Sequence, residues 1–221
     1  MAEVYGEKPK IFTKEWWPYF WLYYKWHTVA FLFVAVLVAM GISDCMKRED
    51  YDLRITALGG VYFDSVALDK IESALEEEIN DIDENEEKNV NIVSLTFVDY
   101  KEYAEQNYAA YIKHDAEFSD PIMQVFIYDR AELEKKEQEG LLQIAFCKTD
   151  DWLERDVSDD MIFYGEDGKA YAVSLKNSSI LKDAGINGED LFVLVKNDAE
   201  SHEKNPKANE NAKIAANKLI K

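Results

Sequence analysis

Cysteine and histidine are scarce in this chain of 221 residues, which contains two cysteines and three histidines. Two thiols, Cys45 and Cys147, cannot build a disulfide framework, so the folded part must be held together by its hydrophobic core. The motifs G-x-x-x-x-G-K-[ST], G-x-G-x-x-G, G-x-S-x-G and H-E-x-x-H are absent as well. These motifs carry phosphate binding, dinucleotide binding, ester hydrolysis and zinc proteolysis. We therefore expect a protein that is not an enzyme.

The remaining candidates for reactive side chains do not change this expectation. His27 precedes an apolar stretch, whereas His114 and His202 lie among polar residues, so we expect structural or solvated roles for all three. Cys147 follows an expected strand, and the neighbouring Lys148 would lower the pKa of a nucleophilic thiol. A buried, unreactive thiol is the alternative that we favour.

Formal charge is missing from one long stretch of the chain. Eighteen residues separate Lys25 from Asp44 and carry no formal charge. As a helix they span ~27 Å, close to the thickness of the hydrocarbon core of a bilayer. Seven rings suited to the headgroup boundary come before its apolar run, which begins at Thr28: Trp16, Trp17, Tyr19, Trp21, Tyr23, Tyr24 and Trp26. A cleaved signal peptide seldom has such a block and no A-x-A pattern follows, so we predict a retained transmembrane helix rather than a signal peptide or a buried core helix.

Cys45 lies directly after this stretch and raises the alternative of a lipid anchor. Lipidated cysteines of bacteria want small, neutral residues before them, and Asp44 is neither. We expect an ordinary thiol at the membrane exit. A diacylglycerol adduct in an intact-mass measurement would contradict the single-helix anchor.

The acidic excess lies entirely after the apolar stretch. Residues 1–50 contain six basic and six acidic residues, whereas the rest contains 19 basic and 38 acidic residues, a net charge of −19. Such a domain is repelled by nucleic acid and by anionic lipid, so no nucleic-acid partner is expected. Four lysines precede the apolar stretch, which favours a cytoplasmic N-terminus and an extracytoplasmic C-terminal domain at the cell membrane.

The chain therefore divides into four parts. We predict a cytoplasmic or interfacial aromatic segment over residues 1–27, a transmembrane helix over 28–44, a tether over 45–51 and an extracytoplasmic α/β domain over 52–221. The domain is long enough for one compact core. Strands are expected at residues 53–58, 90–98, 123–128, 141–146, 161–164, 170–173 and 191–195, and helices at residues 64–79, 100–113, 130–139, 178–184 and from 205 onward. Asp64 and Asn205 are expected helix caps, and the Asp-Gly pair within residues 166–169 predicts a hairpin turn. The expected buried side of the helix at 100–113 consists of Tyr103, Ala104, Tyr108, Tyr111 and Ile112. Because strands and helices alternate through the first half, an α/β sandwich with a mostly parallel sheet is predicted.

An acidic segment after the first helix of the domain offers oxygen ligands at alternate positions, as calcium loops do. The candidate ligands are Asp81, Asp83, Asn85 and Glu87. Glu86 stands where such a loop wants glycine, and Ile92 stands where a bidentate acid should close the shell. A solvated acidic loop without a metal is the alternative that we favour, and no cofactor is expected.

Residues 167–175, DGKAYAVSL, resemble a stretch of extracellular solute-binding proteins of the type 2 periplasmic-binding fold, D-G-K-x-Y-A-[IV]-P-L, with Ser174 in place of proline. Residues 177–186 are similar to the helix that follows in that family, and residues 124–129 to one of its strands. The aromatic entry at residues 23–28 is similar to small anchored proteins of clostridial-type Gram-positive bacteria. The domain is shorter than a complete two-lobed receptor, so the resemblance implies a reduced lobe.

A ligand site implied by this resemblance would lie at strand ends and at a helix N-terminus. Its residues would be Gly59, Gly60, Tyr62, Asp129, Tyr171, Ser174 and Asn177. The alternative is that these residues only close the core. The sequence thus predicts a non-catalytic, membrane-anchored binding or accessory module with a small-molecule ligand or a membrane-protein partner. The other hypothesis is a structural subunit or scaffold of a membrane complex without a small-molecule ligand.

Overall fold

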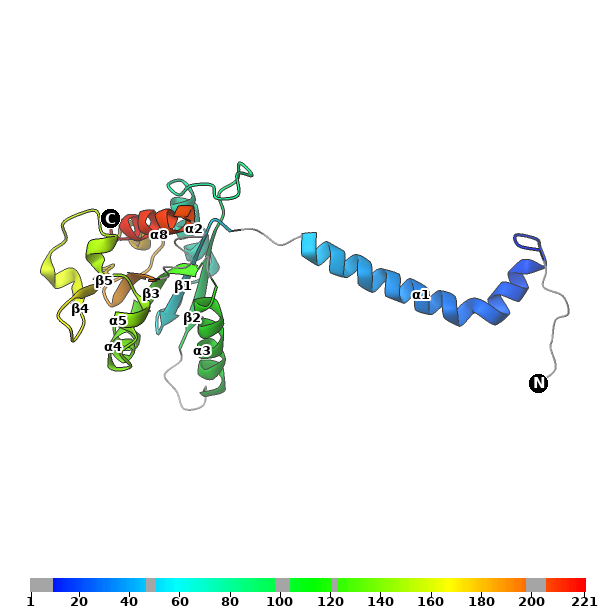
Figure 1. Ribbon diagram of the computed structural model, residues 1–221, viewed down its shortest axis with the longest axis horizontal. Helices are drawn as coiled ribbons and strands as arrows, with labels where there is room; N and C mark the ends of the chain where they lie inside the picture. Colours follow the sequence, from blue (N-terminus) through cyan, green and yellow to red (C-terminus); the bar gives the residue numbers. More distant parts are fainter. Residues whose placement is uncertain (1–9, 47–50, 98–103, 121–122, 198–205) are drawn as a thin grey trace. The chain divides into compact units, whose positions relative to one another are not determined.

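The computed structural model describes residues 10–46, 51–97, 104–120, 123–197 and 206–221. The expected helix cap at Asn205 lies outside these residues, as does His202. The chain separates into two compact units, Met1–Glu49 and Asp50–Lys221 (Figure 1).

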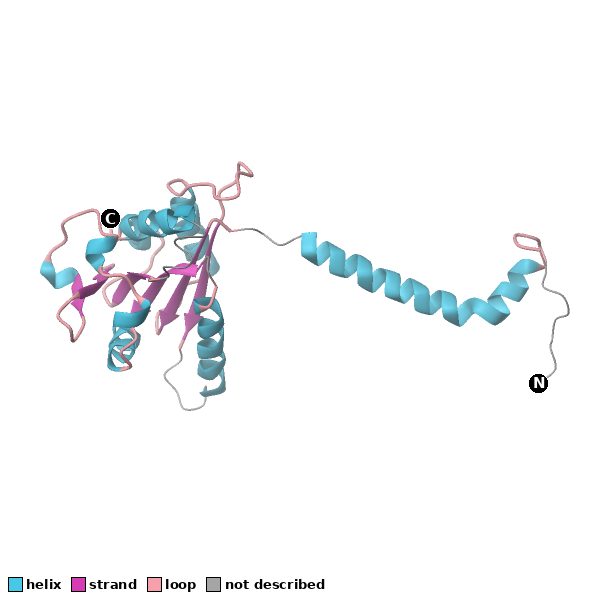
Figure 2. Ribbon diagram, in the orientation of Figure 1, coloured by secondary structure: helices cyan, strands magenta, loops and turns pink. Residues whose placement is uncertain are grey.

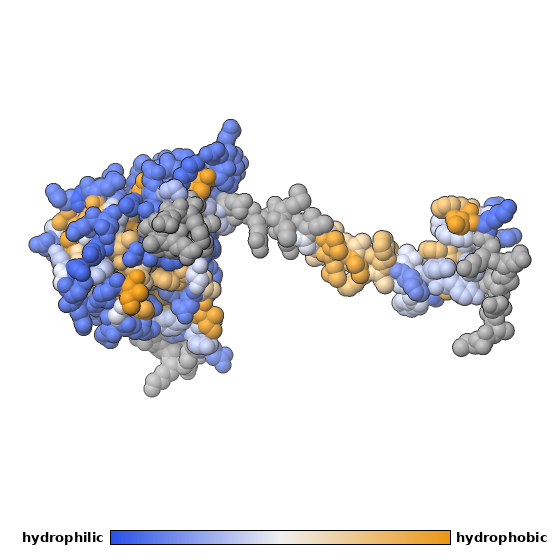
Figure 3. All heavy atoms as spheres, in the orientation of Figure 1, coloured by the Kyte–Doolittle hydropathy of each residue, from blue (hydrophilic) through white to orange (hydrophobic). Residues whose placement is uncertain are grey.

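The first unit contains one long helix, α1 (Trp16–Met46). It begins well before the predicted span and includes the aromatic block, whose rings stack along one side at a spacing of four residues. The ring centroids of Trp16 and Phe20 lie 4.8 Å apart, and those of Phe20 and Tyr24 lie 5.7 Å apart. Figure 3 shows the longest run of hydrophobic residues of α1 in the part of the helix that follows this block. The segment Trp16–Gly41 is long and apolar enough to cross a membrane, and none of its most apolar window is buried within the chain.

The second unit is an α/β domain with helices on both faces of one sheet (Figures 1 and 2). Its strands are β1 (Leu53–Gly59), β2 (Val90–Thr96), β3 (Met123–Asp129), β4 (Ile162–Tyr164), β5 (Ala170–Ser174) and β6 (Leu191–Val195). Its helices are α2 (Ser65–Glu76), α3 (Ala104–Phe118), α4 (Arg130–Gln138), α5 (Leu142–Ala145), α6 (Ser179–Asp183) and α8 (Pro206–Leu219), with short 3-10 turns η2 (Thr149–Asp151) and η3 (Asp159–Met161).

The sheet is mixed, with the strand order β2-β1-β3-β6-β5-β4. β1 pairs in parallel with β2 and with β3, but β3–β6, β6–β5 and β5–β4 are antiparallel. The prediction of a mostly parallel sheet is therefore wrong for the second half. Parallel neighbours need a crossover of a dozen or more residues, whereas β4 and β5 are joined by the short turn at Asp167 and Gly168. That turn was predicted as a hairpin, and the structure confirms it.

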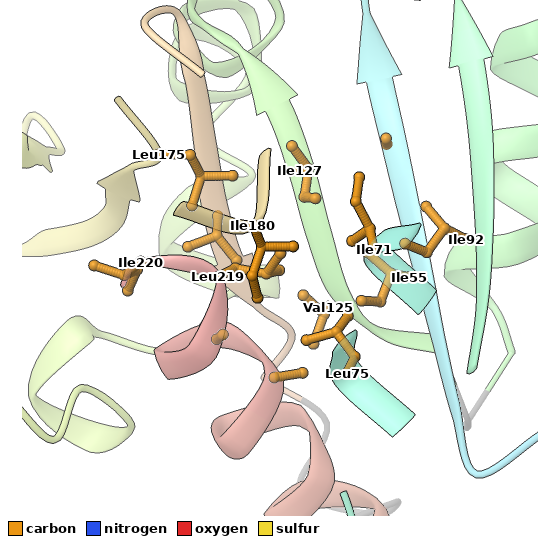
Figure 4. Close-up of a cluster of buried hydrophobic side chains, with 14 of the residues drawn as sticks. Ile55, Ile71, Leu75, Ile92, Val125, Ile127, Leu175, Ile180, Leu219 and Ile220 are labelled. Atoms are coloured by element: carbon orange, nitrogen blue, oxygen red, sulfur yellow. The ribbon is translucent and has the colours of Figure 1, made fainter. Parts of the chain in front are cut away.

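Two hydrophobic clusters fill the space on either side of the sheet. The first lies between the sheet and α2, α6 and α8, and Figure 4 shows Ile55, Val125 and Ile127 of the strands facing Leu75 and Leu219 of the helices. The second lies beneath α3, α4 and α5 and is rich in aromatic rings. The predicted strand at residues 141–146 is wrong, because this run forms the single turn α5, and only Phe146 makes an isolated bridge to the sheet. Short apolar runs do not distinguish a strand from a buried turn.

The buried side of α3 also differs from the expected one. Tyr108 and Ile112 were predicted to be buried, but they are 68% and 53% exposed. Tyr111, which was also predicted to be buried, does pack against the second cluster, and His114 and Phe118 follow it on the same side at a spacing of three and four residues. Tyr100 and Tyr103 lie outside the described residues, so the expected start of this helix at residue 100 stays a prediction.

Helix α8 joins segments that are far apart in the sequence. The buried Asn211 side chain accepts a hydrogen bond from the Asn80 amide (2.8 Å) and donates to the carbonyls of Asn80 (2.8 Å) and Asp52 (3.3 Å). Six residues later on the same helix, the Asn217 side chain accepts a hydrogen bond from the Glu154 amide at 3.0 Å. The last helix thereby holds both the acidic loop after α2 and the loop after η2 against the domain.

Candidate functional site

Three of the predicted ligand residues, Gly59, Gly60 and Asp129, meet beyond the carboxyl ends of β1 and β3. The strand order reverses at β1, so the loop after β1 and the end of β3 form a topological switch point, the usual ligand position in open α/β sheets. Gly59 and Gly60 lie on one side of it and Asp129 on the other, and the side chain of Tyr62 is largely exposed nearby in sequence. The structure therefore brings Gly59, Gly60 and Asp129 into contact.

The carboxylate of Asp129 occupies this switch point. One of its oxygens, Oδ2, accepts a hydrogen bond from the Gly60 amide (2.7 Å), and the other accepts from the Glu132 amide (2.8 Å) and so caps α4. Gly59 adopts φ 155°, and a Cβ there would lie 2.6 Å from Asp129 Cγ. The amides that could hold an anionic ligand at this point are thus already bound to an anion of the chain itself.

Ser174 and Asn177 lie at the same edge of the sheet, because Ser174 ends β5 and pairs with Phe192 at the start of β6. The Ser174 hydroxyl is buried and accepts a hydrogen bond from the Lys176 amide at 3.3 Å. The Asn177 amide group lies 3.4 Å from the sulfur of Met161. Their side chains hold the turn after β5.

Tyr171 lies near the opposite end of β5, apart from the other six residues. Its hydroxyl donates a hydrogen bond to Asp167 Oδ2 (2.9 Å). Burial of the ring, together with this hydrogen bond, raises the pKa of Tyr171 to about 12. The predicted ligand residues are therefore divided between two ends of the sheet.

A cluster of three carboxylates forms at the amino end of the parallel strands. Oxygens of Asp52, Asp81 and Asp83 lie within 4.8 Å of one another, which is a spacing that a cation could bridge. Asp52 is only 2% exposed and accepts hydrogen bonds from the amides of Ile82 (2.6 Å) and Asn89 (2.9 Å). Sequence reasoning missed Asp52, because it precedes the loop by a whole strand and helix.

The loop itself is closed by its own hydrogen bonds. Asp81 accepts from the amides of Glu84 (2.6 Å) and Glu86 (2.8 Å), and these outweigh desolvation and lower the pKa of Asp81. Desolvation and the two neighbouring carboxylates raise the pKa of Asp83. Glu86, which stands where a calcium loop wants glycine, adopts φ 71° and so makes the tight turn without glycine.

Of the other two predicted calcium ligands, neither belongs to the carboxylate cluster. The side-chain oxygen of Asn85 accepts a hydrogen bond from the Glu87 amide (2.7 Å), and its nitrogen donates to Asp83 (2.8 Å). A cation would therefore have Asp52, Asp81 and Asp83 as its carboxylate ligands.

The antiparallel half of the domain holds a cavity of about 550 Å³ that the sequence did not reveal. It lies between the loop at residues 148–157 and the β4–β5 hairpin. Its apolar lining includes Leu153, Val157 and Ile162, and the first two also pack against the core. Three cations line the same cavity, Lys148, Arg155 and Lys169, together with the carboxylates of Asp150 and Asp156.

Two smaller cavities adjoin the same loop. One of about 360 Å³ shares Lys148 and Lys169 with the first and is also lined by Tyr171 and Cys147. Another, of about 410 Å³, shares Arg155 with the first. We call these three cavities together the loop 148–157 groove. The D-G-K-x-Y stretch contributes Lys169 and Tyr171, which is the part of the groove that the sequence pattern could have indicated.

Cys147 shows no sign of activation. Its thiol is half-buried and donates to the Lys196 carbonyl at 3.5 Å. Burial, and then the charge of Asp151, raise the pKa of this thiol, while Lys213 lowers it by less. The hypothesis of an activated nucleophile therefore has no support from this geometry, and the buried, unreactive thiol agrees with it.

His114 lies in a buried network under α3 rather than in the polar surroundings that we expected. Its Nε2 is 2.8 Å from the Tyr128 hydroxyl, and it is packed among the rings of Phe118 and Phe126. Burial, followed by the charge of Lys136, lowers the pKa of His114. These buried contacts agree with the structural one of the two expected roles.

Comparison of the chain with protein-family models, with curated proteins and with solved structures finds no match.

Proposed function

We propose that this chain is a membrane-anchored, non-catalytic binding or accessory module related to solute-binding proteins. The observation that carries the anchor is α1, whose long apolar segment is not buried against any described part of the chain. The α/β domain encloses two hydrophobic clusters of its own. Because exposed apolar surface of this extent needs a non-aqueous environment, a bilayer is its natural surrounding.

The uneven charge supports the proposed topology. Four lysines precede the apolar stretch, and all of the net negative charge follows it. Basic residues favour the cytoplasmic side, whereas long acidic domains cross membranes readily. These charges support the proposed topology, a cytoplasmic N-terminus and an α/β domain outside the cell membrane.

The binding role rests on the loop 148–157 groove. Its largest cavity, about 550 Å³, is within the range of small-molecule sites, and it combines an apolar lining with a few charged groups. The resemblance of the β4–β5 hairpin to a ligand-cleft segment of solute-binding proteins points to the same end of the domain.

The anchor and the topology can be tested on the full-length chain with a C-terminal epitope tag. We expect the protein to stay in membranes after carbonate extraction, and the domain of intact cells to be digested by added protease. The variant Leu37→Arg, which places a charge in the apolar stretch at a cost of roughly 2.5–3.5 kcal/mol of insertion free energy, should be released. Release of the unaltered protein, or protection of its domain, would overturn the proposal.

The exposed tryptophans of α1 favour the second candidate, a structural subunit of a membrane complex. Trp17, Trp21 and Trp26 are 57%, 65% and 74% exposed in the chain alone, which is a surface that a neighbouring membrane protein can cover. A photocrosslinking amino acid at position 21 tests this. A specific crosslinked protein, together with a flat thermal-shift screen of small solutes, would favour the structural subunit over the binding module.

A further inference from the structure

The loop 148–157 groove concentrates positive charge in a domain that has twice as many acidic as basic residues. Lys148 and Lys169 line both the largest and the smallest of its cavities, and Arg155 lines the largest and the third. The three cations therefore lie along one continuous surface. They come from two separate parts of the chain, the loop after α5 and the β4–β5 hairpin.

These cations are not neutralised by close ion pairs in the usual way. Among the described residues, neither Lys148 nor Arg155 forms an ion pair, and Lys169 is paired only with Asp167 at 3.3 Å. Most other cations described in the domain are engaged, as Lys218 is with Glu78 and Arg54 with Asp120. Positive groups left open at a cavity are the feature that recognises an anion.

The floor of the largest cavity is apolar. Ile162 and Tyr164 lie on one side of β4, while Phe163 between them packs against Phe192 on the other side of the sheet. Leu153 and Val157 close the cavity from the loop. An inorganic ion would leave this surface in water, so the cavity fits a ligand with an apolar body as well as a charge.

We propose that this groove binds a small organic anion, with its anionic group between Lys148 and Lys169 and its apolar body over Ile162 and Leu153. This inference rests on the proposed function and deepens it by naming the class of ligand. Asp150 and Asp156 line the same cavity and limit its affinity for anions. The ligand is a soluble solute, because the net negative charge of the domain opposes a surface of anionic lipid.

The test is calorimetric titration of the full-length chain in phosphatidylcholine nanodiscs with phenyl phosphate, which has both an aromatic body and an anionic group. We expect saturable binding that is at least about tenfold tighter than that of inorganic phosphate. The double variant Lys148→Ala/Lys169→Ala should weaken binding at least about tenfold, and Asp150→Asn should strengthen it. The matched control Lys113→Ala removes an exposed lysine of α3 and should change nothing.

Several results would overturn the inference. They are equal affinity for inorganic and phenyl phosphate, unchanged affinity of the double variant, or no binding of phenyl phosphate. Loss of phenyl phosphate binding in nanodiscs that contain phosphatidic acid would identify a lipid headgroup as the ligand and overturn the soluble source. Failure of the titration leaves the membrane anchor intact, whereas carbonate release of the chain removes the proposed function whatever the titration shows.

Discussion

The parallel half of the sheet, β2-β1-β3, and the antiparallel half, β6-β5-β4, differ in how the chain fills the space around their strand ends. At the parallel half, the carboxylates of Asp129 and Asp52 bind the backbone amides of the surrounding loops. At the antiparallel half, Lys148 and Arg155 line open cavities without an ion pair among the described residues. The parallel half thus supplies its own anions, and the antiparallel half leaves cations open to a ligand.

This domain has two candidate positions for a ligand. One is the position that α/β folds usually use, and the other is a cavity that this particular sequence leaves open. In open α/β folds, ligands usually bind at a topological switch point such as the one beside β1. Here the Asp129 carboxylate fills it. In a domain rich in acidic residues, exposed cations at a cavity are the scarcer feature, and they indicate the site better than the fold does.

The largest expected effect is that of Gly59→Ala, which tests how firmly the switch point is filled. The new Cβ would lie 2.6 Å from Asp129 Cγ at φ 155°, so we expect a loss of roughly 3–4 kcal/mol in the free energy of unfolding. Gly140→Ala is the control, since φ is 68° there and no atom lies within 4 Å of the added Cβ. Urea denaturation that shows equal losses for both variants would refute the contact.

Asp52→Ala should have the next largest effect, because it leaves the amides of Ile82 and Asn89 without an acceptor in a buried place. We expect a loss of roughly 2–3 kcal/mol. Since the hydrogen bonds already hold the loop, millimolar calcium should leave the unfolding midpoint of the unaltered chain unchanged and give no heat in calorimetry. A calcium-dependent rise that disappears in Asp52→Ala would show a metal centre instead.

Asp129→Ala removes the cap of α4 and the acceptor of the Gly60 amide, and should cost roughly 1–2 kcal/mol. Asp129→Asn should cost less, since asparagine also caps helices well. The control Asp190→Ala breaks only an exposed 3.9 Å pair with Arg130 and should be close to neutral. Similar losses for Asp129→Ala and Asp190→Ala in urea denaturation would contradict a filled switch point.

Tyr171 makes the stability of the antiparallel half depend on pH in the alkaline range. Its pKa is about 12 in the folded chain against 10.0 for a free tyrosine. A raised pKa in the folded state means a contribution that is complete below pH 10 and is lost as the pH rises toward 12. Tyr171→Phe should therefore remove part of the alkaline loss of stability, and ultraviolet titration of Asp167→Asn should show one tyrosine with a lower pKa. An unchanged titration would refute the Tyr171–Asp167 hydrogen bond.

The smallest effect on stability belongs to the double variant Lys148→Ala/Lys169→Ala, which should stay within about 0.5 kcal/mol of the unaltered chain in urea denaturation. Exposed cations with few ion pairs in the folded chain contribute little to the free energy of unfolding. A loss as large as that of Asp129→Ala would show that these lysines are structural, and would make the two halves of the sheet alike.

Features set by neighbouring residues were predictable from the sequence. The apolar helix, the cap of α2 by Asp64 at 2.7 Å from the Ala67 amide, and the hairpin at Gly168 all rest on local signals. Features that join distant segments were not predictable. β6 pairs antiparallel to β3, and the apolar run at residues 141–146 buries Leu142 and Phe146 from the turn α5 rather than from a strand.

The candidate sites follow the same rule. Asp81 and Asp83 were predicted together because they are close in the sequence, but Asp52 joins them only through the fold. Gly59 and Asp129 were both predicted as ligand residues, and only the structure shows that one fills the space beside the other. The groove lined by Lys148, Arg155 and Lys169 has no periodic pattern in the sequence, because its cations come from a loop and a hairpin.

The Asn211 side chain has a consequence for the order of events during synthesis. Its bond to the carbonyl of Asp52 spans 159 residues of chain, so the region around β1 stays incomplete until α8 has left the ribosome. In the proposed topology, α1 is made first and enters the membrane early, whereas the α/β domain stays unfinished outside the cell until α8 follows. Chains that end before α8 should therefore reach the membrane and then be degraded by surface proteases. Only chains that contain the last helix would complete the fold and persist.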